Sequence, residues 1–335
     1  MKEEQTITER ENVLRLFRGE KPLWFPETGR SMLWVHGKSL DDLERPHYES
    51  GTDWFGVRWQ LQESMGTVGV THPDMEQSPI LEDAADWKEV VAFPDLNKVD
   101  WRKIGEEVAQ NQKTLNGRLP YFMLEHGAFE RLTLLMGFEG ALVALLEEPE
   151  ACREYAEAMA DFKIQVFDRI LELAPYELVM YQDDIGSGHG PFMSVDTYRE
   201  IFKEPLRRVI EHVHSRGLLF GYHSCGRMEA FMEDLLELGI DLVDPVQVCN
   251  DQASFVEKYG SRVVVHSGIN NQEVTDIFEP QEEMLRNEVR RGVDLFGPTG
   301  RYIYKVSATQ MAQNGLDVQK ILYDEFDQYT KDYYR

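Results

Sequence analysis

The stretch LLFGYHSCG, residues 218–226, is a continuous apolar run that ends in polar side chains. Runs of the same kind occur at 178–181, 241–244, 262–266 and 302–306. Helical patterns separate these runs at intervals of roughly 25–40 residues. Strands that are apolar on both faces are typical of a parallel sheet covered by helices. With 121–124 and two weaker N-terminal candidates, the pattern predicts an α/β TIM barrel of about eight βα units. A doubly wound open sheet is the alternative.

The remaining segments fit one domain that spans residues 1–335. Near the N-terminus, Thr6 or Thr8 is expected to cap a helix, and residues 22–26 are expected to form a short strand. Residues 54–119 are irregular and rich in turn signals, and they are too long for a simple connection. We therefore predict that they form an elaborated cap over one end of the barrel.

The composition restricts the classes of partner. The chain has 335 residues, with 60 Asp and Glu against 35 Lys and Arg and a net charge of −25. This charge argues against a nucleic acid or an anionic membrane surface as the main partner. No signal peptide, apolar span of about 18 residues, GxGxxG motif or Walker-type motif is visible. Three scattered cysteines do not make a disulfide framework, so we expect a cytoplasmic protein with free thiols.

The sharpest chemical feature is His223-Ser-Cys225 at the end of a predicted strand. Side chains at positions i and i+2 of extended chain point the same way, so His223 and Cys225 should converge. An imidazole and a thiolate together favour Zn²⁺, and a site with few protein ligands keeps an open catalytic position. The alternative is a buried histidine and an inert buried cysteine, because an isolated HxC pattern is weakly specific.

Other polar residues follow the predicted strands and are candidates for proton transfer or metal binding. Asp183 and Asp184 are expected to act as a metal ligand, a partner of His223 or a proton carrier; the alternative is that they accept backbone N–H bonds. Glu125 is predicted to face the pocket and to be catalytic. His266 fits a hydrogen-bonding group at the barrel mouth better than a ligand.

Five residues are candidates for binding a substrate. They are Glu27, Arg30, Trp59, His126 and His189. Arg30, like Arg58 and Arg227, can bind a carboxylate or a phosphate. The alternative, equally favoured for each, is an arginine exposed to solvent on the surface. Trp59 belongs to an aromatic group that either lines a pocket or fills the core, and His126 either lines the pocket or packs beside Phe129. His189 lies in a glycine-rich loop after Asp184.

The order and spacing of several short motifs resemble the uroporphyrinogen decarboxylase superfamily, which also includes cobamide-dependent methyltransferases. The matching segments are Arg10-Glu-Asn-Val-Leu with Gly19-Glu-Lys-Pro22, Gly51-Thr-Asp53, Phe93-Pro-Asp95-Leu, Glu125-His-Gly127-Ala-Phe-Glu130 with Gly137-Phe-Glu, Asp183-Asp184-Ile-Gly186, Ser194 with Tyr198 and Pro205, His223-Ser-Cys225-Gly226, Gly239-Ile-Asp241 and Gly268-Ile. The resemblance runs almost from end to end, and it implies a TIM barrel.

The resemblance implies two competing activities. The decarboxylases need no cofactor and hold a polyanionic tetrapyrrole through an arginine-rich N-terminal stretch. The matching stretch here retains Gly29 and Arg30 but places Pro26 and Glu27 before them. One arginine beside a glutamate is a poor cradle for such a substrate. A third alternative is a non-catalytic barrel that binds a tetrapyrrole or a protein partner.

The methyltransferase branch is similar in carrying a His-x-Cys pair on zinc, with a third ligand, often cysteine, near the last strand. His223 and Cys225 match the pair, but residues 302–308 contain no cysteine. The third ligand would then come from one of five residues. They are Glu125, Asp183, Asp184, Cys249 and His266.

This branch implies a zinc enzyme that moves a methyl group between an ether, amine or thiol and the cobalamin of a partner corrinoid protein. Because the last strand has no cysteine, an enzyme that transfers the methyl group to a thiol is less favoured. An O-demethylase, which would move the methyl group from an ether to the corrinoid protein, is favoured instead. A homodimer remains open.

Overall fold

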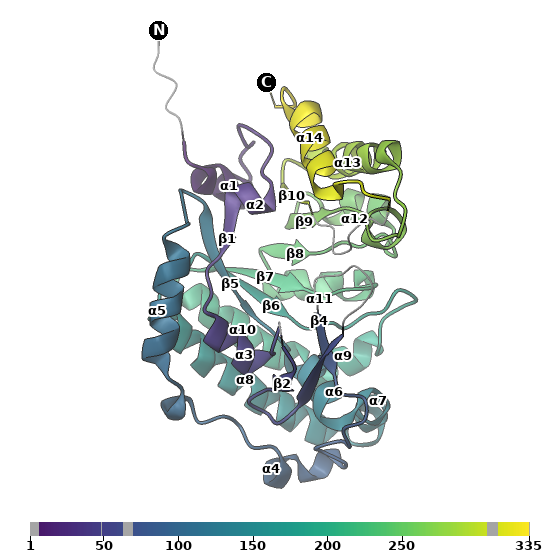
Figure 1. The fold of residues 1–335 in the computed structure, drawn as a ribbon. Helices are drawn as coiled ribbons and strands as arrows, with labels where there is room; N and C mark the ends of the chain where they lie inside the picture. Colours follow the sequence, from purple (N-terminus) through teal and green to yellow (C-terminus); the bar gives the residue numbers. More distant parts are fainter. Residues whose placement is uncertain (1–6, 48, 63–69, 307–313, 335) are drawn as a thin grey trace.

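The computed structural model describes residues 7–47, 49–62, 70–306 and 314–334. Its main sheet has seven parallel strands in the order β1-β5-β6-β7-β8-β9-β10. These strands are β1 (Met32–Trp34), β5 (Leu119–Leu124), β6 (Leu178–Gln182), β7 (Leu219–His223), β8 (Leu242–Asp244), β9 (Val264–Gly268) and β10 (Tyr302–Lys305). Each strand pairs with the next one along the chain, and the sheet curls as a TIM-like barrel does (Figure 1). The doubly wound alternative is wrong, because the strand order never reverses.

All six apolar runs are strands in the structure, but the strand expected at 22–26 is absent. Both ends of that segment are prolines, which have no N–H to donate to a ladder. The chain instead contacts β10 where Glu27 and Tyr304 form an isolated parallel bridge: the Tyr304 N–H donates to the Pro26 carbonyl at 3.0 Å, and the Thr28 hydroxyl donates to the Tyr304 carbonyl at 3.1 Å. This single bridge links the segment before β1 to the opposite edge strand and closes the ring.

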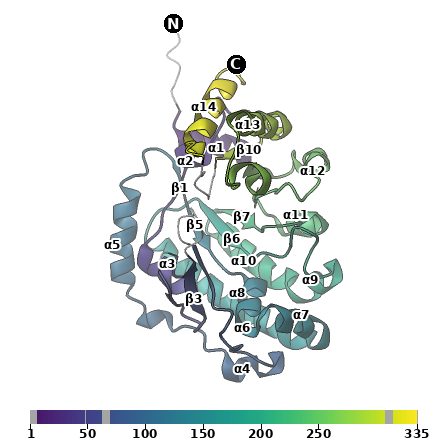
Figure 2. The ribbon, with the colours of Figure 1, turned by 45° about the vertical axis from the view of Figure 1, so that its right-hand side comes forward.

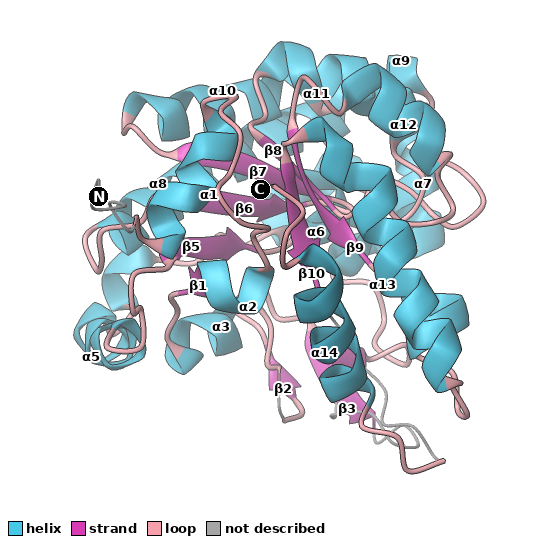
Figure 3. Cartoon of the chain, turned by 90° about the horizontal axis from the view of Figure 1, so that it is seen from above, coloured by secondary structure: helices cyan, strands magenta, loops and turns pink. Residues whose placement is uncertain are grey.

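Helices surround the curled sheet, most of them on its outside and the first one at one end (Figures 2 and 3). They are α1 (Glu9–Phe17), α2 (Thr28–Ser31), α3 (Lys38–Glu44), α4 (Trp87–Val90), α5 (Trp101–Gln112), α6 (Ala128–Met136), α7 (Phe138–Glu147), α8 (Pro149–Leu171), α9 (Val195–Ile201), α10 (Lys203–Ser215), α11 (Met232–Leu238), α12 (Gln252–Tyr259), α13 (Glu282–Phe296) and α14 (Val318–Thr330). Of the two threonines expected to cap the first helix, Thr8 accepts a hydrogen bond from the Glu11 N–H at 3.1 Å; Thr6 lies outside the described residues. None of the described helices is long and apolar enough to cross a membrane.

Two separate apolar clusters show the inside and the outside of the barrel. Along β6, Leu178 and Met180 belong to an interior cluster, whereas Val179 and Tyr181, which alternate with them, pack under the helices. Val13 and Leu16 of α1 belong to the interior cluster, together with the first residues of β5, β6, β8 and β9. Helix α1 therefore plugs the barrel at the N-terminal ends of its strands and leaves the C-terminal ends for chemistry.

The segment predicted as a cap, residues 54–119, contains helices α4 and α5 and two strands of a small antiparallel sheet, whose third strand lies just before the segment. The strands of this sheet are β2 (Gly51–Thr52), β3 (Arg58–Gln62) and β4 (Val70–Pro73), in that order. Short 3-10 turns at Ala84–Asp86 and Leu96–Lys98 lead into the two helices. A role for residues 54–119 as a cap stays a prediction.

Candidate functional site

A polar layer lies on the inner face of the barrel at the C-terminal ends of its strands. Side chains alternate between the two faces of a strand, so residues two positions beyond an interior apolar residue are also interior. Four polar residues lie two positions after an interior apolar residue and are therefore interior as well: Gln182 after Met180, Asp244 after Leu242, His266 after Val264 and Lys305 after Ile303. His223 lies four positions after Leu219 on β7, so it also faces the interior. The apolar filling of the barrel thus ends in a layer of groups that can bind, orient or protonate a ligand.

His223 of this layer and two side chains from the adjoining loops form a compact donor cluster. One ligand atom each from Asp184, His223 and Cys225 lie within 4.8 Å of one another. The Cys225 sulfur is 3.7 Å from His223 Nε2, and Asp184 Oδ1 is 3.8 Å from the same nitrogen. An oxygen, a nitrogen and a sulfur donor at these separations fit a tetrahedral Zn²⁺ with one position left open.

The loops after β6 and β7 hold the cluster together. Cys225 lies beyond the end of β7, so a loop and not the strand pleat turns its side chain toward His223. The Cys225 N–H donates to Asp184 Oδ1 at 2.7 Å, and the Ile185 N–H donates to the Ser224 hydroxyl at 3.0 Å. These bonds extend the contact between the two strands past the sheet and fix Asp184 beside the His-x-Cys segment.

Glycines allow the two loops to approach this closely. Gly226 has a φ of +80°, and a Cβ built on it would lie 2.4 Å from the carbonyl oxygen of Gly186. We expect Gly226→Ala to lower stability by about 1–3 kcal/mol through backbone strain. It should also weaken zinc binding at least about tenfold, because it pushes Asp184 away from Cys225. Thermal unfolding and zinc titration measure the two effects.

Gly188 offers a matched control for that substitution. It lies in the same loop as Gly186, and a Cβ built on it would meet nothing within 4 Å. Gly188→Ala should therefore change stability by less than about 0.5 kcal/mol and leave zinc affinity unchanged. Equal zinc affinities for Gly226→Ala and Gly188→Ala would contradict the importance of the close approach.

His223 is fixed by a carboxylate on the side opposite the cluster. Its Nδ1 is 2.5 Å from Asp244 Oδ2. Burial alone would lower the pKa of His223, but the nearby Asp244 and Cys225 raise it well above the usual value. Burial opposes ionisation of Asp244, yet Lys305, His266 and His223 hold the pKa of this carboxyl well below its usual range. Asp244 is therefore an ionised carboxylate inside the barrel.

Asp183 points away from the cluster, although it directly precedes Asp184. Its carboxylate accepts the backbone N–H groups of Phe129 at 3.3 Å and Glu130 at 2.8 Å, at the start of α6. Burial raises the pKa of Asp183 to about 7 despite these two bonds. Asp183 thus has the backbone-accepting arrangement that the sequence left open as the alternative, and its catalytic role stays a prediction.

Glu130 lies close to both aspartates. Burial, reinforced by Asp184 and Asp183, raises the pKa of Glu130 to about 8. The Gln182 side chain donates to Glu130 Oε1 at 3.4 Å. A carboxyl with this pKa retains its proton near neutral pH, so the chain holds a proton source beside the donor cluster.

Glu125, His126 and Trp59 are buried outside the donor cluster. Glu125 Oε1 lies 3.1 Å from His47 Nε2. His126 adopts a φ of 51°, and its Nδ1 is 3.2 Å from the Arg131 guanidinium. The Trp59 indole N–H donates to Asp53 at 3.1 Å, and only 3% of Trp59 is exposed. The catalytic role of Glu125 and the substrate contacts of Trp59 and His126 stay predictions.

Glu27 and Arg30 contact the last helix. Arg30 pairs with Asp327 of α14 and lies over the Tyr323 ring at 4.9 Å from its centroid. The buried Glu27 carboxylate caps α2 through the Gly29 and Arg30 N–H groups and accepts the Tyr323 hydroxyl at 3.2 Å. Both residues therefore attach α14 to the seam of the barrel, and substrate binding by either one stays a prediction.

The remaining candidates are placed around the site. His189 is exposed in the loop after Asp184. His266 Nε2 lies 2.6 Å from the Thr28 hydroxyl, and its Nδ1 is 3.1 Å from Asp244 Oδ1. Among the described residues, neither His266 nor Cys249 joins the donor cluster. Residues 307–313, which directly follow the last strand, lie outside the described part of the chain.

Asp244, Lys305 and Glu130 are site residues that the sequence reasoning missed. Asp244 and Lys305 are the final residues of β8 and β10, each two positions after an interior apolar residue. The alternation of side chains along each strand is the sequence signal that identifies these two residues. Glu130 had no such signal, because its position depends on how α6 meets Asp183.

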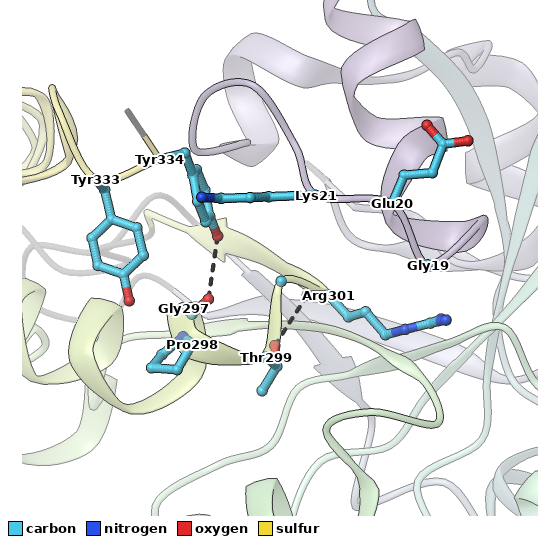
Figure 4. Close-up of a pocket in the computed structure, with 10 residues that line it drawn as sticks. Gly19, Glu20, Lys21, Gly297, Pro298, Thr299, Arg301, Tyr333 and Tyr334 are labelled. Carbon is cyan, nitrogen blue, oxygen red and sulfur yellow. Dashed lines mark hydrogen bonds between the residues drawn. The ribbon is translucent and has the colours of Figure 1, made fainter.

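A separate cavity of about 410 Å³ lies at the opposite end of the barrel, where Arg301 precedes β10 (Figure 4). Figure 4 shows the Lys21 side chain across the Tyr334 ring, with its ammonium 5.3 Å from the ring centroid, and the Arg301 side chain directed away from it. The Tyr334 hydroxyl donates to the Gly297 carbonyl at 3.3 Å. None of the candidate site residues lines this cavity.

Comparisons with known proteins agree with this architecture. The family model described as uroporphyrinogen decarboxylase (URO-D) matches residues 60–324. No curated protein matches the chain. A methyltransferase from Methanosarcina mazei is similar in structure, with a TM-score of 0.70 and 13% identity over 97% of this chain and 99% of that one. An endo-beta-1,4-mannanase double mutant from Cellulomonas fimi aligns with a TM-score of 0.47 and 10% identity, over 97% of this chain and 74% of that one. At 13% identity, the likeness to the Methanosarcina mazei protein concerns the fold alone.

Proposed function

Since the chain belongs to the uroporphyrinogen decarboxylase family, we propose that it is a zinc-dependent methyltransferase acting with a corrinoid protein. The observation that carries this proposal is the Asp184–His223–Cys225 cluster at the C-terminal ends of the barrel strands. Active sites of TIM barrels lie at this end. The Methanosarcina mazei protein, whose fold matches almost the whole chain, is itself a methyltransferase.

The donor set supports zinc as the metal. Asp184 and Cys225 supply two negative charges when ionised, which balance Zn²⁺, and His223 supplies a neutral nitrogen. Asp184 is our choice for the third ligand. Zinc in such a site acts as a Lewis acid that makes an ether or amine heteroatom a better leaving group or lowers the pKa of a thiol.

The chain's own residues would serve the transfer in two ways. The cluster residues bind and orient the methyl donor at the barrel mouth, and Asp244 holds His223 in place. When an ether or amine loses its methyl group to the partner's cobalt, its heteroatom takes up one proton. Glu130 retains a proton near neutral pH and lies close to Asp184, so we assign it as the donor of that proton.

The decarboxylase alternative has less support. A polyanionic substrate needs several guanidinium partners. Arg30 is engaged by Asp327 and Tyr323, Arg58 is paired with Asp74 at 2.9 Å, and the Lys305 ammonium is bound to Asp244. The positive charges of Arg30, Arg58 and Lys305 are therefore already used within the protein.

Metal analysis combined with a transfer assay tests the proposal. Protein purified without chelators should contain about one zinc per chain. It should methylate free cob(I)alamin from at least one member of a panel of aryl methyl ethers, methylamines and methyl thioethers, as followed by the cobalamin spectrum. Metal-free protein that releases CO₂ from uroporphyrinogen would establish the decarboxylase instead. Metal-free protein without either activity would favour a non-catalytic barrel.

A further inference from the structure

The buried Asp244 carboxylate, next to the donor cluster, contacts three side chains that can donate hydrogen bonds. Asp244 is 3% exposed, and it faces His223, His266 and Lys305 from three different strands. Its Oδ2 is 2.5 Å from His223 Nδ1, and its Oδ1 is 3.1 Å from both His266 Nδ1 and the Lys305 ammonium. Both carboxylate oxygens are therefore held, and the group cannot rotate freely.

The contact with His223 decides which imidazole nitrogen is available to a metal. Both oxygens of Asp244 accept from the Lys305 ammonium, so the carboxylate is the acceptor in its 2.5 Å contact with His223, and Nδ1 is the donor. The other nitrogen, Nε2, is then left to face Cys225 at 3.7 Å and Asp184 at 3.8 Å. In metal sites, a carboxylate that accepts the second N–H of a histidine fixes both its tautomer and its ring orientation.

Lys305 explains why the carboxylate can remain ionised inside the barrel. An isolated buried charge is costly, and a paired one is stable when its hydrogen bonds are satisfied. The Lys305 ammonium lies 3.1 Å and 3.3 Å from the two oxygens of Asp244. The last strand, β10, thereby contributes to the support of a histidine on β7, although it supplies no ligand to the donor cluster.

We propose that Asp244, held by Lys305, is a positioning residue that presents Nε2 of His223 to the metal. The inference rests on the zinc site of the proposed function, but not on the reaction or its substrate. Because Asp244 acts through His223, its removal should change metal binding more than the stability of the fold.

Zinc affinity of Asp244→Asn is the first test. An asparagine amide can donate to Nδ1 as well as accept from it, so the tautomer is no longer fixed. We expect about 10–100-fold weaker zinc binding in competition with a chromophoric chelator. Asp241→Asn is the matched control, because Asp241 also pairs with a histidine, His214 at 2.9 Å, but outside the donor cluster. Its zinc affinity should equal that of the wild type.

A measurement on the wild-type protein keeps the proposal testable if Asp244→Asn does not fold. In metal-free protein labelled with ¹⁵N-histidine and measured at a pH above the raised pKa of His223, NMR should report a single imidazole proton on this residue, carried by Nδ1. A proton on Nε2 alone would overturn the positioning role, as would equal zinc affinities for the wild type and Asp244→Asn. Lack of methyl transfer by a zinc-loaded wild type would contradict the proposed reaction alone, so the two failures are distinguishable.

Discussion

His223→Ala is expected to abolish zinc binding, whereas the wild type should hold about one zinc per chain. His223 supplies the nitrogen donor of the cluster, and its side chain lies between Asp184 and Cys225 on one side and Asp244 on the other. Losing a group that merely orients a metal ligand costs about 10–100-fold in affinity. Loss of the ligand itself should exceed that range. Elemental analysis and zinc titration measure the change.

The control for this experiment is another histidine. His72 lies exposed on β4, away from the donor cluster, so His72→Ala should retain the zinc of the wild type. Circular dichroism should show that His223→Ala remains folded, since its side chain belongs to the polar layer and not to the apolar core. Full zinc occupancy in folded His223→Ala protein would contradict the metal site.

Lys163→Met should produce the largest loss of stability, about 3–5 kcal/mol, because it breaks a buried ion pair. Lys163 on α8 is completely buried, and its ammonium lies 3.0 Å and 3.1 Å from the two oxygens of Glu44. It also donates to the Glu125 carbonyl at 2.5 Å, which ties α8 to the end of β5. Methionine fills a similar volume but leaves the Glu44 carboxylate without this partner. Urea unfolding measures the difference.

The stability loss caused by Lys163→Met should increase as the pH rises. Burial already raises the pKa of Glu44 above its usual 4.5, and Lys163 opposes that shift. Without Lys163 the folded pKa rises further, so above about pH 4.5 the folded variant binds more protons than its unfolded chain. Its stability therefore falls as pH rises, and the gap to the wild type should be smaller at about pH 5 than at about pH 8.

A more exposed pair that involves the same helix provides the comparison. Lys88 of α4 pairs with Glu154 of α8 at 2.6 Å, and the two side chains are 61% and 42% exposed. Lys88→Met should cost less than about 0.5 kcal/mol, because solvent screens such a pair. Adding Glu44→Gln to Lys163→Met should recover part of the loss, since it removes the stranded charge. A cost for Lys163→Met as small as that for Lys88→Met would refute the importance of the buried pair.

The site was predictable where its geometry is local in the sequence. His223 and Cys225 are two residues apart, and their side chains do converge. The choice between Asp183 and Asp184 was not predictable, because it depends on the distant N-terminus of α6, whose N–H groups engage Asp183. The contacts of Asp244 likewise come from three strands that the sequence separates widely.

The fold was predictable for a related reason. Each central strand is a continuous apolar run, because helices cover one face and the barrel interior the other. The strand predicted at 22–26 was wrong. The aromatic and apolar residues of this segment suit a strand, but its two prolines cannot donate the backbone hydrogen bonds of a β-ladder. Its role as the closing segment follows only from the position of Tyr304 on β10.

The bridge between Glu27 and Tyr304 joins a segment that is made before all strands of the main sheet to the strand of that sheet that is made last. A ribosome releases the N-terminal segment first, and that segment must wait for β10 before the ring can close. Until then the growing sheet keeps an exposed strand edge, which is a template for unwanted pairing. Helix α14 follows β10 and attaches to the same seam through Arg30 and Glu27. We therefore expect nascent chains of this protein to need protection from aggregation until the last strand and helix have emerged.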